Sequence, residues 1–257
     1  MSDGRVHYSA AEGIASVRFD RPEARNAMTW SMYAELASAC AAMAADASVR
    51  VAVFRGTGEA FVAGTDIGQF TTFQGADDGV AYERKVEDAI EQIERLAMPT
   101  IAVVEGWCMG GGLAIATACD FRIATPAARF GVPIARTLGN CLSVANVARL
   151  MAALGAPRTK RMLLLAESIS GEEATAGGYV DKLVPPADVA AAVDAMCARL
   201  KGHAPLTMRA AKEAIRRLTI ANLPDGEDLV RACYGSADFK EGVASFLAKR
   251  KPEWRGR

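Results

Sequence analysis

The sequence predicts an α/β protein in which a core of parallel strands is followed by a helical region. From residue 49 to residue 124, short β-rich segments alternate with helical ones, and this rhythm is typical of a parallel sheet. After Val184-Pro185-Pro186 the pattern changes, because helical periodicity then continues without an intervening strand. We therefore expect an α/β core over residues 1–186 and a C-terminal helical region over residues 187–257.

Strands and helices are expected to alternate through the first hundred residues. Residues 14–19 (IASVRF) form a β-rich run that ends at an Asp-Arg-Pro turn. Residues 29–45 carry apolar side chains at helical spacing, and residues 49–55 predict the next strand. A long amphipathic helix is expected over residues 78–97. It has to end before the following Met-Pro pair, because a residue that precedes proline avoids the α region.

The middle of the chain holds the most informative segment. Residues 100–104 are an apolar run of the kind found in buried parallel strands. A turn that ends in Gly110-Gly111-Gly112 follows, then a buried helix over residues 113–120 and a strand over residues 121–124. The C-terminal region is expected to hold helices over residues 187–201, 204–220 and 227–250.

The composition disfavours several classes of function. The chain has 30 basic and 30 acidic residues, and this balance argues against a nucleic-acid-binding surface and a polybasic membrane patch. With two histidines and no CxxC pair, we expect no metal site. The six dispersed cysteines fit a reducing compartment. The N-terminal segment lacks the apolar core of a secretory signal, and the most apolar stretch is too interrupted to span a bilayer. We expect a cytoplasmic protein.

Two glycine-containing turns each follow an expected strand and precede an expected helix. One covers residues 61–67 (FVAGTDI), and the other is the triplet of residues 110–112. Amides in such turns have no intrahelical partner and lie at the positive end of the helix dipole. Two of them converging on one oxygen would polarise a thioester carbonyl and stabilise its enolate. A tight turn without a ligand explains the spacing equally simply. Because the triplet lacks the GxGxxG spacing and no GxxxxGK[ST] is present, a dinucleotide site and a P-loop are disfavoured.

Six segments, taken together and in this order, resemble the signature blocks of the crotonase (enoyl-CoA hydratase/isomerase) superfamily. They are RPEARNAM (21–28), FVAGTDIGQF (61–70), EGWCMGGGLAIATACDFRIAT (105–125), ARFGVP (128–133), SISGEEATAGGYVDKLVP (168–185) and EGVASFLAKRKPEW (241–254). The resemblance covers nearly the whole chain. It implies a spiral of repeated ββα units, with C-terminal helices that build trimers, often paired into hexamers. It also implies an acyl-coenzyme A substrate, and no permanently bound cofactor, since coenzyme A enters as part of the thioester.

The resemblance also implies individual site residues. The oxyanion-hole amides fall on Thr65 and Gly111. Where the family often has a lysine, this chain has Gly68, so one phosphate or adenine contact is expected to be missing. Asp66 is a candidate acid, although a helix-start residue that binds free amides is the simpler interpretation. The residues expected to border the coenzyme A are Ala24, Arg25, Ala63, Thr65, Asp66, Ile67, Gly68, Gly111, Phe246 and Lys249.

The sequence departs from the family pattern at the two positions that matter most for hydration. Hydratases of this family use two glutamates to handle one water. This chain has Ala114 two residues past the glycine triplet and Ile134 directly after the FGxP segment, in place of the two glutamates. Neither side chain can exchange a proton, and each acid–base group is worth about 10²–10⁴-fold in rate. Ordinary hydration is therefore not expected.

Residues 134–143 should still face the acyl group, and they offer three further candidates. Arg136 would bind a substrate carboxylate, or else be a surface or trimer-contact arginine. Cys141 would act as a nucleophile only if its pKa were lowered, and otherwise is a packed small residue. Asn140 completes the set. Decarboxylation of a β-carboxyacyl-CoA, or C–C cleavage of a β-keto substrate, fits these residues best. The alternative is a catalytically silent acyl-CoA-binding paralogue or assembly partner.

Overall fold

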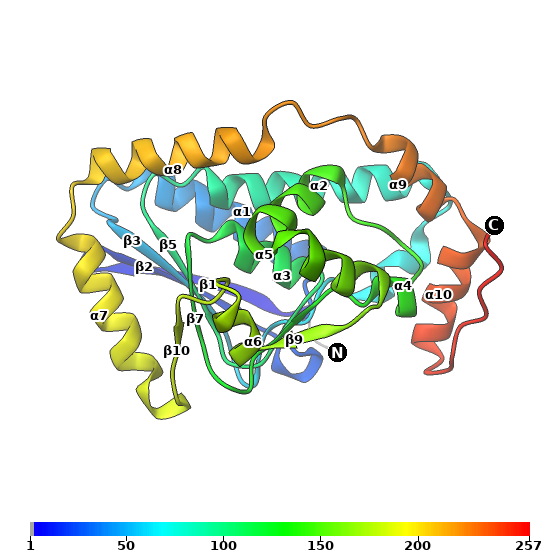
Figure 1. Cartoon of the computed structure of the whole chain (residues 1–257), viewed down its shortest axis with the longest axis horizontal. Helices are drawn as coiled ribbons and strands as arrows, with labels where there is room; N and C mark the ends of the chain where they lie inside the picture. The colour runs from blue at the N-terminus through cyan, green and yellow to red at the C-terminus, as the bar shows by residue number, and fades with distance from the viewer. Residues whose placement is uncertain (1–2) are drawn as a thin grey trace.

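Two β-sheets of unequal size form the framework of the chain, in a computed structural model that describes residues 3–257 (Figure 1). The larger sheet contains β1 (Arg5–Ala11), β2 (Ile14–Asp20), β3 (Val51–Gly56), β5 (Thr100–Val104), β7 (Phe121–Ala124) and β10 (Lys182–Leu183), in that order. The smaller sheet contains β4 (Ala60–Val62), β6 (Trp107–Met109), β8 (Arg129–Gly131) and β9 (Ser168–Ser170). The β1–β2 and β8–β9 pairs are antiparallel and the other pairs are parallel, so both sheets are mixed.

Helices follow the strands along the chain and dominate its C-terminal part. The α-helices are α1 (Trp30–Ala45), α2 (Ala76–Glu94), α3 (Gly111–Ala118), α4 (Ile134–Thr137), α5 (Val144–Leu164), α6 (Gly171–Ala176), α7 (Val189–Lys201), α8 (Pro205–Ile220), α9 (Glu227–Tyr234) and α10 (Ala237–Leu247). Short 3₁₀ helices are η1 (Pro22–Ala24), η2 (Ile67–Thr72) and η3 (Pro186–Asp188). Within residues 3–257, none of the helices combines the length and the apolar character that crossing a membrane requires.

A strand–strand–helix unit repeats along the chain. In each repeat one strand joins the larger sheet, the next joins the smaller sheet, and a helix follows. The three repeats are β3-β4-α2, β5-β6-α3 and β7-β8-α5, with short helices inserted in the first and the last. This arrangement confirms the predicted α/β class and its spiral of ββα units. Residues 1 and 2 of the predicted core lie outside the described residues.

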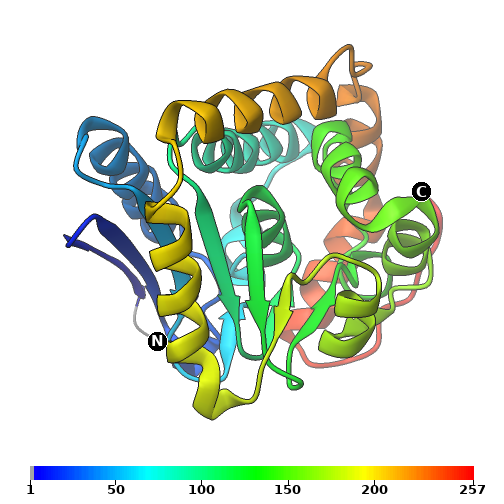
Figure 2. The same cartoon turned by 60° about the vertical axis from the view of Figure 1, so that its left-hand side comes forward.

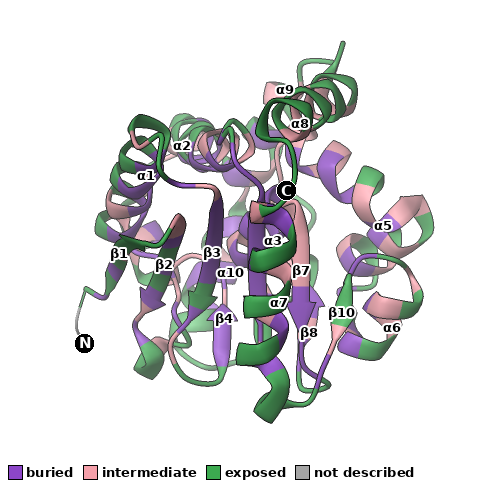
Figure 3. Cartoon of the chain, turned by 90° about the vertical axis from the view of Figure 1, so that its left-hand side faces the viewer, coloured by how far each residue is buried: buried purple, intermediate pink, exposed green. Residues whose placement is uncertain are grey.

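The larger sheet is buried on both faces because alternate side chains point to opposite sides. Ala52 and Phe54 face the main core formed with α1, α2 and α3. Val51 and Val53 face a second core formed with α7, which includes Val189. Figure 2 shows α7 lying along this face of the sheet, and Figure 3 shows buried strands behind an α7 whose outer side is exposed. Burial on both faces explains the continuous apolar runs in the sequence.

The expected helix over residues 227–250 is two helices in the structure. α9 ends at Tyr234, and Ser236 begins α10 by accepting a hydrogen bond from the Phe239 amide. A serine at this position caps a new helix more readily than it continues an old one. The two helices lie at the opposite end of the molecule from α7 (Figure 1). They pack against α2 and η2, so this part of the C-terminal region helps to build the site described below.

Candidate active site

The two glycine turns lie side by side because β4 and β6 are neighbours in the smaller sheet. Each turn contains a glycine with positive φ, Gly64 at 105° and Gly110 at 50°, a conformation that L side chains rarely adopt. A Cβ atom added to Gly110 would lie 3.7 Å from the Cα of Gly64, and one added to Gly111 would lie 3.5 Å from Oγ1 of Thr65. The second turn therefore brings the first residue of α3 next to Thr65.

The backbone amides of Thr65 and Gly111 are both free. The residues that flank Thr65 pair with Met28, since the Met28 amide donates to the Gly64 carbonyl and the Asp66 amide donates to the Met28 carbonyl. In such a parallel bridge the N–H of the central residue points to the other side. Gly111 is the first residue of α3, so its N–H has no intrahelical acceptor. Within residues 3–257 neither amide donates a hydrogen bond to a protein acceptor.

Thr65 and Gly111 line one inner cavity of about 130 Å³, which adjoins an outer groove of about 650 Å³. Ala63, Thr65 and Phe246 line both spaces, so the inner cavity lies directly behind the groove. Most other residues around the cavity are apolar, and they include Phe70, Val86, Met109, Leu138 and Leu142. Two free amides in a mostly apolar cavity are suited to hold an oxygen that carries negative charge.

A chain of hydroxyl groups supports the Thr65 turn from behind. Oγ1 of Thr65 lies 2.8 Å from the Tyr33 hydroxyl and 2.9 Å from the Tyr82 hydroxyl. Burial raises the pKa of Tyr33 to about 12, so this phenol is neutral at physiological pH. A Cβ atom on Gly111 would lie only 2.8 Å from the Tyr33 hydroxyl. The same tyrosine therefore borders both turns.

Most of the residues expected at the coenzyme A line the outer groove. These are Ala24, Arg25, Ala63, Thr65, Asp66, Ile67 and Phe246. Gly68 and Lys249 are among the lining residues of neither space. The carboxylate of Asp66 accepts a hydrogen bond from the Gly68 amide and pairs with Arg21 at 2.7 Å. Asp66 thus serves as a helix-start residue, which was the simpler of its two interpretations.

The candidate residues of the segment 134–143, which follows β8, lie in different places in the structure. Asn140, Ala114 and Ile134 line the inner cavity. Arg136, the candidate for a substrate carboxylate, is exposed and lines the outer groove, and it is not among the lining residues of the inner cavity.

Cys141 lies outside the lining of both spaces. Its Sγ is 3.6 Å from the Leu229 carbonyl oxygen, and the neighbouring Cys233 thiol together with burial raises the pKa of Cys141. The nucleophile hypothesis required a lowered pKa, so the structure favours its alternative, a packed small residue.

A carboxyl group that the sequence motifs did not indicate reaches the inner cavity from α2. Glu83 lines this cavity with a relative exposure of 5%. Its Oε1 accepts a hydrogen bond from the Tyr234 hydroxyl at 2.7 Å, and its Oε2 accepts one from the Ser143 amide at 2.9 Å. Burial raises the pKa of Glu83 to about 7. One signal was present in the sequence, since Glu83 falls on the same helical stripe as Val86, Ile90 and Ile93.

The elevated pKa of Glu83 predicts that the protein loses stability as the pH rises from about 4.5 to about 7. The folded protein binds this proton more tightly than the unfolded chain, so the stabilisation is complete below the ordinary pKa and disappears above the folded one. Its size is on the order of 3 kcal/mol. Urea unfolding of the wild type and of Glu83→Gln at pH 5 and pH 8 measures this pH-dependent stabilisation. The stability of the variant relative to the wild type should increase at pH 8, and a difference that does not change with pH would contradict the prediction.

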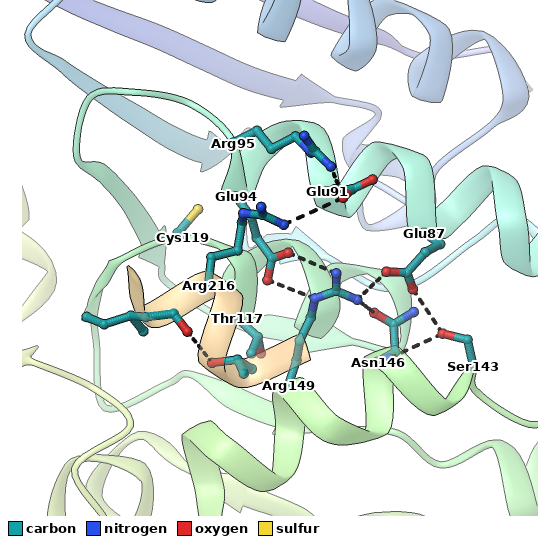
Figure 4. Close-up of polar contacts among 12 residues, drawn as sticks. Glu87, Glu91, Glu94, Arg95, Thr117, Cys119, Ser143, Asn146, Arg149 and Arg216 are labelled. Carbon is teal, nitrogen blue, oxygen red and sulfur yellow. Dashed lines mark hydrogen bonds and ion pairs between the residues drawn. The ribbon is translucent and has the colours of Figure 1, made fainter. Parts of the chain in front are cut away.

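An ion-pair cluster between α2 and α5 fixes the segment that carries Asn140. Figure 4 shows the Arg149 guanidinium between two carboxylates of α2. Arg149 donates to both oxygens of Glu94 at 2.8 Å and to Glu87 at 2.5 Å. The Ser143 hydroxyl donates to Glu87 at 3.0 Å, while the Ser143 amide donates to Glu83. The start of α5 is therefore held to α2 at the wall of the inner cavity.

Comparisons with known proteins agree on one family. The family model described as Enoyl-CoA hydratase/isomerase matches residues 9–257. The Homo sapiens protein named Enoyl-CoA hydratase domain-containing protein 2, mitochondrial, is 32% identical over 255 residues, covering 96% of this chain and 87% of that protein. The crystal structure of an enoyl-CoA hydratase/carnithine racemase from Magnetospirillum magneticum is similar over 100% of this chain and 97% of that chain, with 32% identity and a TM-score of 0.80. A methylmalonyl-CoA decarboxylase complexed with 2S-carboxypropyl CoA is 25% identical over 100% of both chains, with a TM-score of 0.89.

Proposed function

Because this chain belongs to the enoyl-CoA hydratase/isomerase family, we propose that it is an acyl-CoA enzyme that stabilises a thioester enolate with the amides of Thr65 and Gly111. The observation that carries the proposal is the pair of free amides at one inner cavity, directly behind the outer groove. A thioester oxygen placed between them receives two hydrogen bonds that strengthen as negative charge develops.

The outer groove is the proposed path of the coenzyme A. Arg25 and Arg136 line it, and guanidinium groups suit phosphate oxygens. We therefore propose that Arg136 contacts the coenzyme rather than an acyl carboxylate. Gly68 and Lys249 stand apart from the groove lining, so the proposal assigns them no contact. Assembly of the chain into a trimer or hexamer stays a prediction.

Decarboxylation of a malonyl-type thioester is the proposed reaction. The bond between the α carbon and the carboxylate carbon breaks, CO₂ leaves, and the electron pair moves onto the thioester oxygen between the two amides. This step needs no base. Ala114 and Ile134 offer none at the cavity, and the chain is similar to a methylmalonyl-CoA decarboxylase along its whole length. The apolar cavity wall also favours neutral CO₂ over a carboxylate.

Assays with two thioesters test the proposal. We expect the purified protein to decarboxylate methylmalonyl-CoA or a similar malonyl-type thioester, measured by chromatography of the acyl-CoA product. We expect little hydration of crotonyl-CoA, because each missing carboxylate costs about 10²–10⁴-fold in rate. Rapid crotonyl-CoA hydration would overturn the proposed reaction. Calorimetric binding of these thioesters with turnover of none of them would instead favour a catalytically silent binding protein.

A further inference from the structure

We propose that Glu83 is the catalytic acid–base residue of this site and transfers a proton to and from the α carbon of a short acyl thioester. The inference rests on the proposed function, since it places the thioester oxygen at Thr65 and Gly111. Glu83 lines the same inner cavity as these two residues, although it lies on a different element, α2. Ala114 and Ile134 also line this cavity but carry no titratable group, whereas Glu83 supplies one.

Glu83 differs from the structural carboxylates of the same helix. Glu87 and Glu94 both pair with Arg149, as expected of carboxylates that hold two helices together. Across residues 3–257, no Lys, Arg or His side chain forms an ion pair with Glu83, whose partners are the Tyr234 hydroxyl and the Ser143 amide. A carboxylate has about four lone-pair positions, so two remain for a substrate proton.

Among residues 3–257, the groups that interact electrostatically with Glu83 are neutral or acidic, while the adjacent Arg84 is exposed and pairs with Glu227. Tyr33 on α1, Tyr82 and Glu87 on α2, Cys141 before α5 and Tyr234 on α9 interact with it electrostatically. None of them is a cation that would hold the carboxyl permanently ionised. Burial without a cation raises the pKa of Glu83 to about 7, where both protonation states are populated and proton transfer is efficient in either direction.

Glu83 also has a route to solvent that a bound thioester would not block. It lines a second hollow of about 260 Å³, together with Arg84, Glu87 and Ser143. Arg84 is exposed, so this hollow opens at the surface. Glu83 thus lines both the inner cavity and this hollow. Water in the hollow can restore its proton while the acyl group fills the inner cavity.

The inner cavity limits the substrate to a short acyl group. Its volume is about 130 Å³, and an apolar cavity of about 150 Å³ accepts a molecule the size of benzene. Oδ1 of Asn140 is buried without a hydrogen-bond partner among the described residues, while its amide nitrogen donates to the Tyr234 hydroxyl. A hydrogen-bond donor on the acyl group, or an ordered water beside it, would satisfy this oxygen.

The proton-transfer step balances in both directions. In the forward direction the Glu83 carboxylate takes a proton from the α carbon, and the C–H electron pair forms the enolate, whose negative oxygen lies between the Thr65 and Gly111 amides. In the reverse direction the Glu83 carboxyl returns the proton to the α carbon. Decarboxylation generates the same enolate by loss of CO₂. The carboxyl then protonates it and regains its proton from water.

Hydrogen exchange in D₂O tests this step with butyryl-CoA as the probe. We expect the wild type to incorporate deuterium at the α carbon, measured by mass spectrometry. The rate should rise with pH to a plateau above about 7, because the base is the carboxylate. Glu83→Gln should lower the exchange rate by about 10²–10⁴-fold, with unchanged affinity for butyryl-CoA by calorimetry. Glu91→Gln is the matched control on the same helix, since Glu91 pairs with Arg95 away from the cavity, and it should exchange like the wild type.

Two outcomes overturn the role of Glu83 alone: wild-type exchange rates in a folded Glu83→Gln, or a wild-type rate that does not change between pH 5 and pH 9. If the variant does not fold, the wild-type pH profile decides. A wild type that binds butyryl-CoA without exchanging its α hydrogens also overturns the role of Glu83, but it leaves acyl-CoA binding intact. A wild type that binds no CoA thioester overturns both proposals.

Discussion

Replacing Gly111 by proline, compared with replacing it by alanine, should lower the rate of α-hydrogen exchange by about 10²–10³-fold. Both substitutions add a Cβ atom, which would lie 2.8 Å from the Tyr33 hydroxyl, so both are made in a Tyr33→Phe background that removes this oxygen. Proline is tolerated at the first position of a helix, where Gly111 begins α3. The two variants differ at the backbone nitrogen, where alanine keeps the N–H and proline carries its ring Cδ in place of the hydrogen.

The comparison between these two variants tests whether the thioester oxygen lies at the Gly111 amide. Removing a single donor of an oxyanion hole costs about 3 kcal/mol of transition-state stabilisation. Circular dichroism and calorimetric binding of butyryl-CoA show whether both variants still fold and bind. Equal exchange rates in the two folded variants would mean that the Gly111 amide does not hold the oxygen, and the proposed function would lose its central observation.

Replacing Arg149 by methionine should lower the free energy of unfolding by about 3–5 kcal/mol. The Arg149 side chain is 3% exposed, and its removal takes away the ion-pair partner that Glu87 and Glu94 share. Urea unfolding at pH 8 measures the loss. The triple variant that also carries Glu87→Gln and Glu94→Gln should recover part of it, because the unpaired charges are then gone.

A second arginine, Arg95, provides the matched control for the Arg149 substitution. Arg95 pairs with Glu91 on the surface of α2, and its side chain is 60% exposed (Figure 4). Arg95→Met should change the free energy of unfolding by no more than about 1 kcal/mol, as is usual for exposed ion pairs. If Arg149→Met were as mild as this control, the cluster would not be what holds α5 to α2.

Local sequence patterns determined the longer elements of the fold. The strands expected over residues 100–104 and 121–124 are β5 and β7 at the same bounds. Both are central strands of the larger sheet, so burial leaves a continuous apolar run in the sequence. α1 and α8 likewise begin within one residue of their expected starts, since long amphipathic helices repeat their pattern over several turns.

Shorter or interrupted elements depended on tertiary contacts. β4, β6, β8 and β9 have three residues each, too few to show a period, and only their mutual pairing in the smaller sheet makes them strands. α5 was not predicted because it contains Pro157 and a non-helical Gly155 with φ of 76°. β1 was also missed, although it pairs with β2 along its whole length.

The sequence by itself determined the family, the two glycine turns and the absence of glutamates at positions 114 and 134. Only the tertiary structure decided which polar groups share the inner cavity. It placed Arg136 in the outer groove and Cys141 in a packed position, and it brought Glu83 to the cavity wall. The physical reason is that motifs report local backbone geometry, whereas the direction of a helix face is set by what it packs against. Burial in the folded protein raises the pKa of Glu83, while its hydrogen bonds to Tyr234 of α9 and to Ser143 at the start of α5 oppose that rise.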